Sequence, residues 1–212
     1  MTVGAMAMGE PMFPLLSLSR LRMEVDGEGV TTLIAGAGCP LSCKWCINQK
    51  ILQTTPTPVT ARELFDRVKI DDLYFQATGG GVTFGGGESL LHIDFIRQFR
   101  TLCGNRWKIY AETSLCIPQT AVETATRCVD GFIVDIKDMD PEIYRAYTGK
   151  EAALAHSNLE YLLSLVGPER ILVRIPLIPD FNTKEAQSRS VETLKAMGFT
   201  RLDPFSYIIK DQ

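Results

Sequence analysis

Three cysteines, Cys39, Cys43 and Cys46, fall within one short segment, with three residues in the first interval and two in the second. Thiolate sulfur is a soft ligand suited to iron–sulfur clusters, and a 4Fe–4S cluster normally takes four protein ligands. Because this segment supplies three thiolates, one iron would lack a protein ligand. The spacing therefore predicts a 4Fe–4S cluster with one iron open to a bound molecule.

Zinc, a disulfide and unpaired core cysteines are the alternatives for this segment. Structural zinc sites usually have four ligands, but the chain has no second close cysteine pair and only two histidines, His92 and His156. We expect both histidines on helix surfaces or at helix caps. Disulfides are disfavoured because the sequence shows no secretory signal. Zinc remains open as the weaker alternative. The remaining cysteines lack metal-type spacing and are expected to be small buried residues. These remaining cysteines are Cys103, Cys116 and Cys128.

A glycine-rich segment follows farther along the chain. The apolar run Val82–Phe84 leads into Gly85, Gly86, Gly87 and Glu88, which is typical of a strand that ends in a turn where backbone can approach a ligand closely. Such turns more often punctuate structure than bind a ligand. A binding role for this segment is indicated only in combination with the cysteines upstream.

Strand-like apolar runs alternate with helical patterns, which predicts an α/β fold: an open, partial parallel βα barrel of about six strands. We expect a single domain over residues 1–212, with residues 1–20 poorly ordered or loosely packed. Strands are expected at Leu21–Val25, Val30–Ile34, Val82–Phe84, Lys108–Glu112, Phe132–Ile136, Ile171–Ile175 and Arg201–Tyr207. Helices are expected from the capping box at Thr60 and Glu63 to Val68, and at Ile93–Cys103, Gln119–Cys128, Leu159–Val166 and Lys184–Met197.

Composition limits the classes of partner. The 212 residues are 45% hydrophobic and 22% charged with a net charge of −3, and they contain no dense lysine or arginine cluster. Nucleic-acid binding depends on neutralising phosphates, so we expect no nucleic-acid partner. No run reaches the length of a membrane span, and the sequence predicts no membrane association and a cytoplasmic protein.

Polar residues follow several of the expected strands, as in Glu112–Ser114, Asp135–Lys137, Arg174–Pro176 and Pro204–Ser206. Functional side chains of βα barrels gather at the carboxyl ends of the strands. Asp135 and Lys137 could instead form an exposed ion pair of little energetic value, and Trp45 could be a core aromatic residue.

The cysteine segment followed by Gly86–Glu88 resembles the signature of the radical S-adenosylmethionine (SAM) enzymes. Later segments, Ile133–Lys137, Pro141–Gly149 and Arg174–Pro179, are most similar to those of the glycyl-radical enzyme activases, and closest to the pyruvate formate-lyase activating enzymes. The resemblance covers nearly the whole chain after Arg20.

That resemblance implies roles for individual residues. Gly86, Gly87 and Glu88 would hold the amino group of SAM, and Trp45 and Ile47 would flank the cluster beside the adenine. It also implies that Asp135 and Lys137 touch SAM or a nearby monovalent cation, that Arg174 neutralises the SAM carboxylate, and that Thr113 and Glu112 belong to the same polar ring.

The resemblance further implies an anaerobic activity. The reduced cluster would cleave SAM to methionine and a 5′-deoxyadenosyl radical, which would take hydrogen from a glycine of a partner glycyl-radical enzyme. An external donor such as flavodoxin or ferredoxin would supply the electron, and we expect a monomer. No cysteine lies between Cys46 and Val82, so a single cluster is expected, and the end of the chain near Tyr207 would leave the barrel's side open to a peptide loop.

Two segments depart from these relatives. Glu112-Thr113-Ser114-Leu115 stands where they have Asp-Thr-Asn-Gly, and Ser206 stands where many have a histidine. Two other functions therefore remain open: a radical SAM enzyme acting on a small molecule, and a noncatalytic iron–sulfur or zinc scaffold that binds no SAM.

Overall fold

Eight strands form one sheet in the order β3-β1-β2-β4-β5-β6-β7-β8 in the computed structural model, which describes residues 10–23 and 25–207. Six consecutive strands are parallel, as the sequence predicted. They are β2 (Val30–Gly36), β4 (Gly81–Gly86), β5 (Lys108–Thr113), β6 (Gly131–Asp135), β7 (Ile171–Leu177) and β8 (Arg201–Ser206). Within the described ranges β3 and β8 are the two sheet edges, so the predicted open barrel is confirmed.

The strands β1 (Phe13–Met23) and β3 (Thr57–Val59) add to this sheet in antiparallel orientation. The expectation of a loosely packed segment over residues 1–20 is therefore wrong for Phe13–Arg20, which belong to β1, while residues 1–9 lie outside the described residues. Phe13 is fully buried and Leu15 is 6% exposed, so alternate residues fill the core. Pro14 is accommodated opposite Pro58 of β3.

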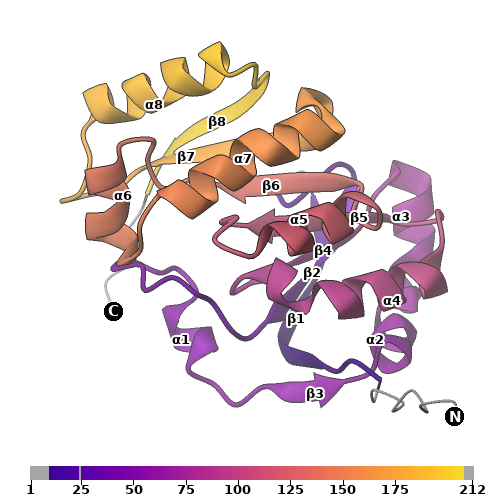
Figure 1. Ribbon diagram of the computed structural model, residues 1–212. Coiled ribbons are helices and arrows are strands. Elements are labelled where there is room, and N and C mark those ends of the chain that lie inside the picture. The colour runs from indigo at the N-terminus through magenta and orange to yellow at the C-terminus, as the bar shows by residue number, and fades with distance from the viewer. Residues whose placement is uncertain (1–9, 24, 208–212) are drawn as a thin grey trace, which may run out of the picture.

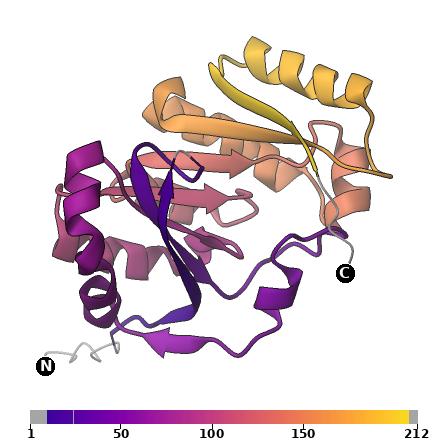
Figure 2. The ribbon, with the colours of Figure 1, turned by 180° about the vertical axis from the view of Figure 1, so that it is seen from behind.

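Helices cover one face of the sheet, and the strands are seen directly from the opposite side (Figures 1 and 2). The expected helices are present as α2 (Ala61–Val68), α4 (Ile93–Cys103), α5 (Gln119–Thr126), α7 (Ala153–Val166) and α8 (Lys184–Ala196). The capping box of α2 is formed in both directions between Thr60 and Glu63. The sequence analysis missed α1 (Gln49–Leu52), α3 (Asp72–Thr78), α6 (Pro141–Thr148) and the three short 3₁₀ helices Lys69–Asp71, Ser89–His92 and Pro168–Arg170.

Aromatic side chains fill the space between the helices and the first strands. Phe84 meets Phe13 and Phe99 edge to face, with ring centroids 5.6 and 5.5 Å apart, and Trp107 stacks on Phe65 at 4.9 Å. Such pairs add stabilisation beyond their buried area. This packing holds β4 rigidly, and β4 ends in the glycine-rich turn.

Two of the cysteines outside the loop behave as predicted, and the histidines are partly buried. Cys103 and Cys128 are buried, whereas Cys116 is half-buried. Nε2 of His92 lies 2.8 Å from the Ala37 carbonyl oxygen, just before the cysteine loop.

Candidate functional site

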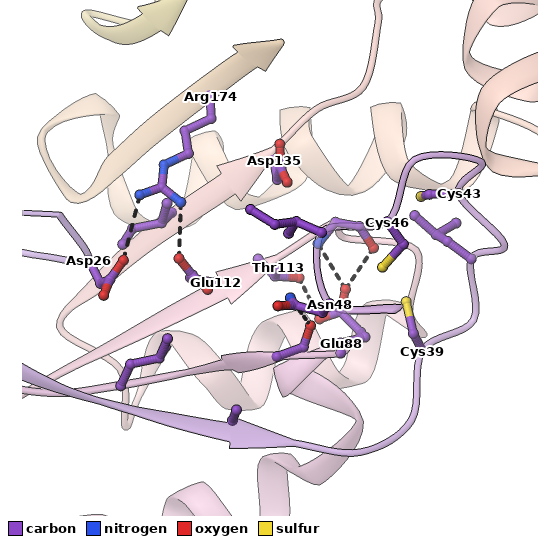
Figure 3. A pocket seen from close by; sticks show the side chains of 18 of the residues that line it. Asp26, Cys39, Cys43, Cys46, Asn48, Glu88, Glu112, Thr113, Asp135 and Arg174 are labelled. Carbon is purple, nitrogen blue, oxygen red and sulfur yellow. Dashed lines mark hydrogen bonds and ion pairs between the residues drawn. The ribbon is translucent and has the colours of Figure 1, made fainter. Parts of the chain in front are cut away.

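The carboxyl ends of the parallel strands and the cysteine loop enclose one cavity of about 390 Å³. Twelve of the thirteen residues predicted from the sequence line it: Cys39, Cys43, Cys46, Ile47, Gly86, Gly87, Glu88, Glu112, Thr113, Asp135, Lys137 and Arg174. Figure 3 shows the three cysteines at one end of this cavity and Arg174 with Asp26 and Glu112 at the other. A sulfur-rich end and a charged end therefore face one shared space.

The cysteine loop is held by α6. The backbone N–H of Ser42 donates to the carbonyl of Thr148 at 2.9 Å, and that of Lys44 donates to the carbonyl of Tyr147 at 3.1 Å. These carbonyls come from the last turn of α6, where helical carbonyls lack intrahelical partners. The loop thus satisfies the helix end, and the helix end fixes the loop.

Burial favours the protonated thiol at two of the three cysteines, Cys39 and Cys43. Burial raises the pKa of Cys39, and it raises the pKa of Cys43 to about 12 although Lys137 acts in the opposite direction. Loading with metal would therefore release protons, because thiolates are the ligands. Among the described residues, no group of three or more His, Cys, Asp or Glu side chains is arranged to hold a single metal ion. Three soft donors on one cavity wall fit a multi-iron cluster better than a closed zinc site.

Trp45 is the predicted residue that does not line the cavity within the described part of the chain. Its indole Nε1 donates to the Pro179 carbonyl at 3.3 Å, and its own carbonyl accepts from the Tyr147 hydroxyl at 3.2 Å and from Tyr207. The side chain anchors the loop to the end of β7. Ile47, in contrast, lines the cavity and is 81% exposed.

The glycine-rich turn is pressed against the start of the cysteine loop. Gly87 donates to the Gly36 carbonyl at 3.0 Å, and Glu88 donates through its backbone to the Gly38 carbonyl at 2.8 Å. A Cβ on Gly87 would lie 2.0 Å from the Gly38 oxygen. Glycine is therefore required here by the close approach of two backbones.

Glu88 has both carboxylate oxygens occupied by donors from neighbouring loops. One accepts from the Leu90 N–H at 3.2 Å and the Thr113 hydroxyl at 2.7 Å, and the other from the N–H and hydroxyl of Ser114 at 2.8 and 2.7 Å. Burial raises the pKa of this carboxyl, and the hydrogen bonds counteract part of that effect. The side chain orders the loop after β5, so it offers a ligand no vacant acceptor.

A network of ions forms the charged end of the cavity. The Arg174 guanidinium donates to Glu112 at 3.0 Å and to the Val25 carbonyl at 2.5 Å, and it lies 3.9 Å from Asp26 and 4.0 Å from Asp203. Burial raises the pKa of Glu112, with Arg174 acting against the shift. Arg22 also lines this end and pairs with Asp26, so two guanidiniums face the three carboxylates.

Asp135 and Lys137 form an ion pair between the two ends of the cavity. Burial, the largest single effect, disfavours the charged form of Lys137, but the charge and hydrogen bond of Asp135 together with Cys43 and Tyr207 outweigh it, and the pKa rises to about 12. The Oδ1 atom of Asp135 is buried and has no hydrogen-bond partner among the described residues. A buried carboxylate oxygen without a partner fits a cationic ligand group such as the ammonium or sulfonium of SAM.

The cavity is also lined by residues that were not predicted to belong to the site, among them Asp26, Asn48, Ser114, Tyr147 and Tyr207. Asn48 follows the cysteine loop and donates through its side-chain amide to the Gly86 carbonyl at 2.6 Å, so it joins the two predicted segments. Ser206, which stands at the family's histidine position, is exposed, and the next residue, Tyr207, lines the cavity instead. The position of Tyr207 in the sequence, next to Ser206, could have identified it as a residue of the cavity.

Within the described residues, no helix is both long enough and apolar enough to cross a membrane.

Comparisons with known proteins agree with this geometry. The model of the radical SAM superfamily matches residues 33–188. The chain is 26% identical to the (2S)-3-sulfopropanediol dehydratase activating enzyme of Klebsiella oxytoca, over 86% of this chain and 80% of that protein. It is 31% identical to the pyruvate formate-lyase-activating enzyme of Listeria monocytogenes, over 73% of this chain and 65% of that protein.

The fold is also found among solved structures. Streptococcus suis SuiB, crystallised with S-adenosylmethionine, superimposes with a TM-score of 0.62 at 14% identity, over 82% of this chain and 41% of SuiB. The matched segment of the superfamily model contains the cysteine loop and all the strand ends that line the cavity except that of β8. The chain belongs to the radical SAM superfamily, whose cofactors are the 4Fe–4S cluster that the cysteine loop predicted and the S-adenosylmethionine that the resemblance implied.

Proposed function

We propose that this protein activates a glycyl-radical enzyme. The observation that carries the proposal is the single cavity in which three cysteine thiols, the Gly86–Glu88 turn and the charged cluster around Arg174 face one another. The relatives whose names describe activating enzymes of glycyl-radical enzymes support the same activity. This chain spans 80% of the first of them and 65% of the second.

The two ends of the cavity would bind different groups: the cysteines the cluster, and the charged residues the polar groups of SAM. Cys39, Cys43 and Cys46 would hold three irons of the cluster and leave the fourth for SAM. When bound and reduced, the cluster supplies the electron that splits SAM to methionine and a 5′-deoxyadenosyl radical. Arg174 is the guanidinium able to meet the SAM carboxylate, and the free oxygen of Asp135 is the acceptor for a cationic group.

The amino group of SAM is best assigned to backbone carbonyls of the glycine-rich turn. Glu88 already accepts four hydrogen bonds, and a carboxyl can serve a new donor only by losing one of these. Glu88 therefore acts by positioning the turn and the loop after β5. A monovalent cation beside Asp135 and Glu112 remains compatible with the surplus of carboxylates there.

Substrate access fits a peptide. Ile47, a large apolar side chain, lines the cavity and is 81% exposed, so it is available for contact with a partner. We propose a glycine-bearing loop as the occupant, an external one-electron donor, and action as a monomer.

The test uses anaerobically reconstituted protein, SAM, a chemical reductant, and pyruvate formate-lyase or (2S)-3-sulfopropanediol dehydratase as partner. We expect a glycyl radical in the electron paramagnetic resonance (EPR) spectrum of one partner, and no radical with the Cys43→Ala variant. Cys128→Ala, at a buried cysteine away from the cavity, should behave as the unaltered protein. SAM cleavage without a radical on either partner would favour a small-molecule substrate instead.

A further inference from the structure

Leu115 has a backbone conformation that a non-glycine residue rarely adopts. Its φ is 59°, in the left-handed region where the Cβ of an L-residue crowds the following carbonyl oxygen. Its side chain is fully buried. Such outliers persist only where the surrounding structure enforces them, and they gather at functional sites. Leu115 lies in the loop after β5, directly after Ser114, which lines the cavity.

Asn158 on α7 holds this loop from the helix side. Its side-chain amide donates to the carbonyl oxygens of Leu115 at 2.9 Å and of Ile117 at 2.8 Å. Asn158 is 1% exposed, so these bonds are shielded from water, and each carbonyl would lose a buried partner without them. A side-chain amide has two N–H donors, one for each carbonyl. The two bonds therefore fix the strained residue and the chain that follows it.

The two residues before Leu115 supply three of the four hydrogen bonds that Glu88 accepts through its carboxylate. The Thr113 hydroxyl donates to one carboxylate oxygen at 2.7 Å and accepts from the Leu115 N–H at 2.9 Å. The N–H and hydroxyl of Ser114 donate to the other oxygen at 2.8 and 2.7 Å. Thr113 and Glu88 lie beside each other in Figure 3. Because Thr113 also bonds to Leu115, the conformation of Leu115 is linked to the contacts of Glu88.

Glu88 connects this loop to the cofactor site. It directly follows Gly87 in the glycine-rich turn, and its own N–H donates at 2.8 Å to the carbonyl of Gly38, the residue before Cys39. An unbroken series of hydrogen bonds therefore runs from α7 to the turn and to the start of the cysteine loop. Asn158 itself is not among the described residues that line the cavity.

We propose that Asn158 is a positioning residue of the SAM site. It holds Leu115 in the left-handed conformation, which keeps Thr113 and Ser114 bonded to Glu88. The backbone carbonyls of the glycine-rich turn are thereby held in place for the amino group of SAM. The inference rests on the proposed function, which assigns the amino group to this turn. Asn158 acts only through these residues.

The experiment measures SAM binding by equilibrium dialysis to anaerobically reconstituted wild type and Asn158→Leu. Leucine has a similar branched shape but no N–H donor. Without these bonds Leu115 leaves the left-handed region, and SAM must restore it on binding. The dissociation constant should therefore rise about tenfold, the factor that matches the strain of one non-glycine residue in this region. The rate of 5′-deoxyadenosine formation at saturating SAM should stay unchanged, because the bound geometry is restored.

Adding Leu115→Gly to Asn158→Leu separates positioning from a general loss of stability. Glycine adopts the left-handed conformation without strain, so the double variant should regain most of the SAM affinity. It also loses a buried leucine side chain, so it should unfold at a lower urea concentration than Asn158→Leu. Affinity and stability then move in opposite directions, which a merely structural role of Asn158 does not produce.

Two further variants complete the test. Leu162→Ala is the matched control, because Leu162 is fully buried on the same helix; its truncation should lower stability but leave SAM affinity unchanged. Leu115→Val keeps Asn158 and strains the loop directly, since a β-branched side chain strongly disfavours the left-handed region. It should weaken SAM binding, and it keeps the proposal testable if Asn158→Leu does not fold.

The failures can be told apart. Wild-type SAM affinity in Asn158→Leu, or in Leu115→Val, overturns this inference alone. A loss of affinity that Leu115→Gly does not relieve, or that Leu162→Ala reproduces, also overturns it, because general destabilisation then accounts for the effect. A wild-type protein that holds a cluster but binds no SAM overturns the proposed function and this inference together.

Discussion

Replacing Gly87 with alanine should disconnect the glycine-rich turn from the cysteine loop. The added Cβ would lie 2.0 Å from the Gly38 oxygen, where ordinary contact begins at 3.4 Å. The Gly38 backbone must therefore retreat by about 1.4 Å. Gly38 directly precedes Cys39, and a metal site tolerates displacement of its ligands by only about 0.5 Å. We expect Gly87→Ala to lose most of its iron after reconstitution.

Gly80→Ala is the matched control because it creates the same clash at the other end of β4. Its Cβ would lie 1.9 Å from the Val30 oxygen, away from the residues that line the cavity. Both variants should lose about 1–3 kcal/mol of unfolding free energy from overpacking, measured by urea denaturation. Only Gly87→Ala should lose iron and visible absorption. Equal iron contents in the two variants would refute the geometric argument.

Three further changes test other parts of the account. Asn48→Ala should remove the hydrogen bond to Gly86 and weaken SAM binding about fivefold, near 1 kcal/mol; unchanged affinity by equilibrium dialysis would exclude that link. Although burial opposes its charge, Asp71 has its pKa lowered from 3.8 by hydrogen bonds from Arg20 and Thr32. Asp71→Asn should therefore lower the free energy of unfolding by about 1–3 kcal/mol at pH 7. The difference in unfolding free energy between wild type and variant should shrink as pH falls below 3.8. A difference that stays constant between pH 7 and pH 3 in urea unfolding would contradict this. Cys128→Ser should retain full iron content, and iron loss there would mean that the ligand set is misassigned.

The parallel strands could be predicted because each one shows a local pattern. In β6, for example, the buried apolar run Phe132–Val134 is followed by Asp135, which falls at the carboxyl end of the strand. The shared position of Asp135 and Arg174 follows directly, since parallel pairing sets them side by side. The strands and the residues at their ends could be predicted because they depend on neighbouring residues in the sequence and on the rule that functional side chains gather at the carboxyl ends of parallel strands.

The features that the sequence did not reveal depend on distant contacts. The first part of β1, Phe13–Arg20, was missed because Pro14 interrupts its pattern, yet pairing with β3 accommodates Pro14. Asp26 lies in a turn, and only the packing of that turn against β7 brings it to Arg174. Trp45 turns toward Pro179, 134 residues away in sequence. No local pattern encodes these contacts.

The most direct test of the account is SAM cleavage by the reconstituted protein. Wild-type protein and the Cys43→Ala variant would be loaded anaerobically with iron and sulfide, reduced in the presence of SAM, and assayed for 5′-deoxyadenosine. We expect 5′-deoxyadenosine from wild type and none above background from Cys43→Ala. A wild-type protein that holds a stable cluster but leaves SAM intact would contradict it.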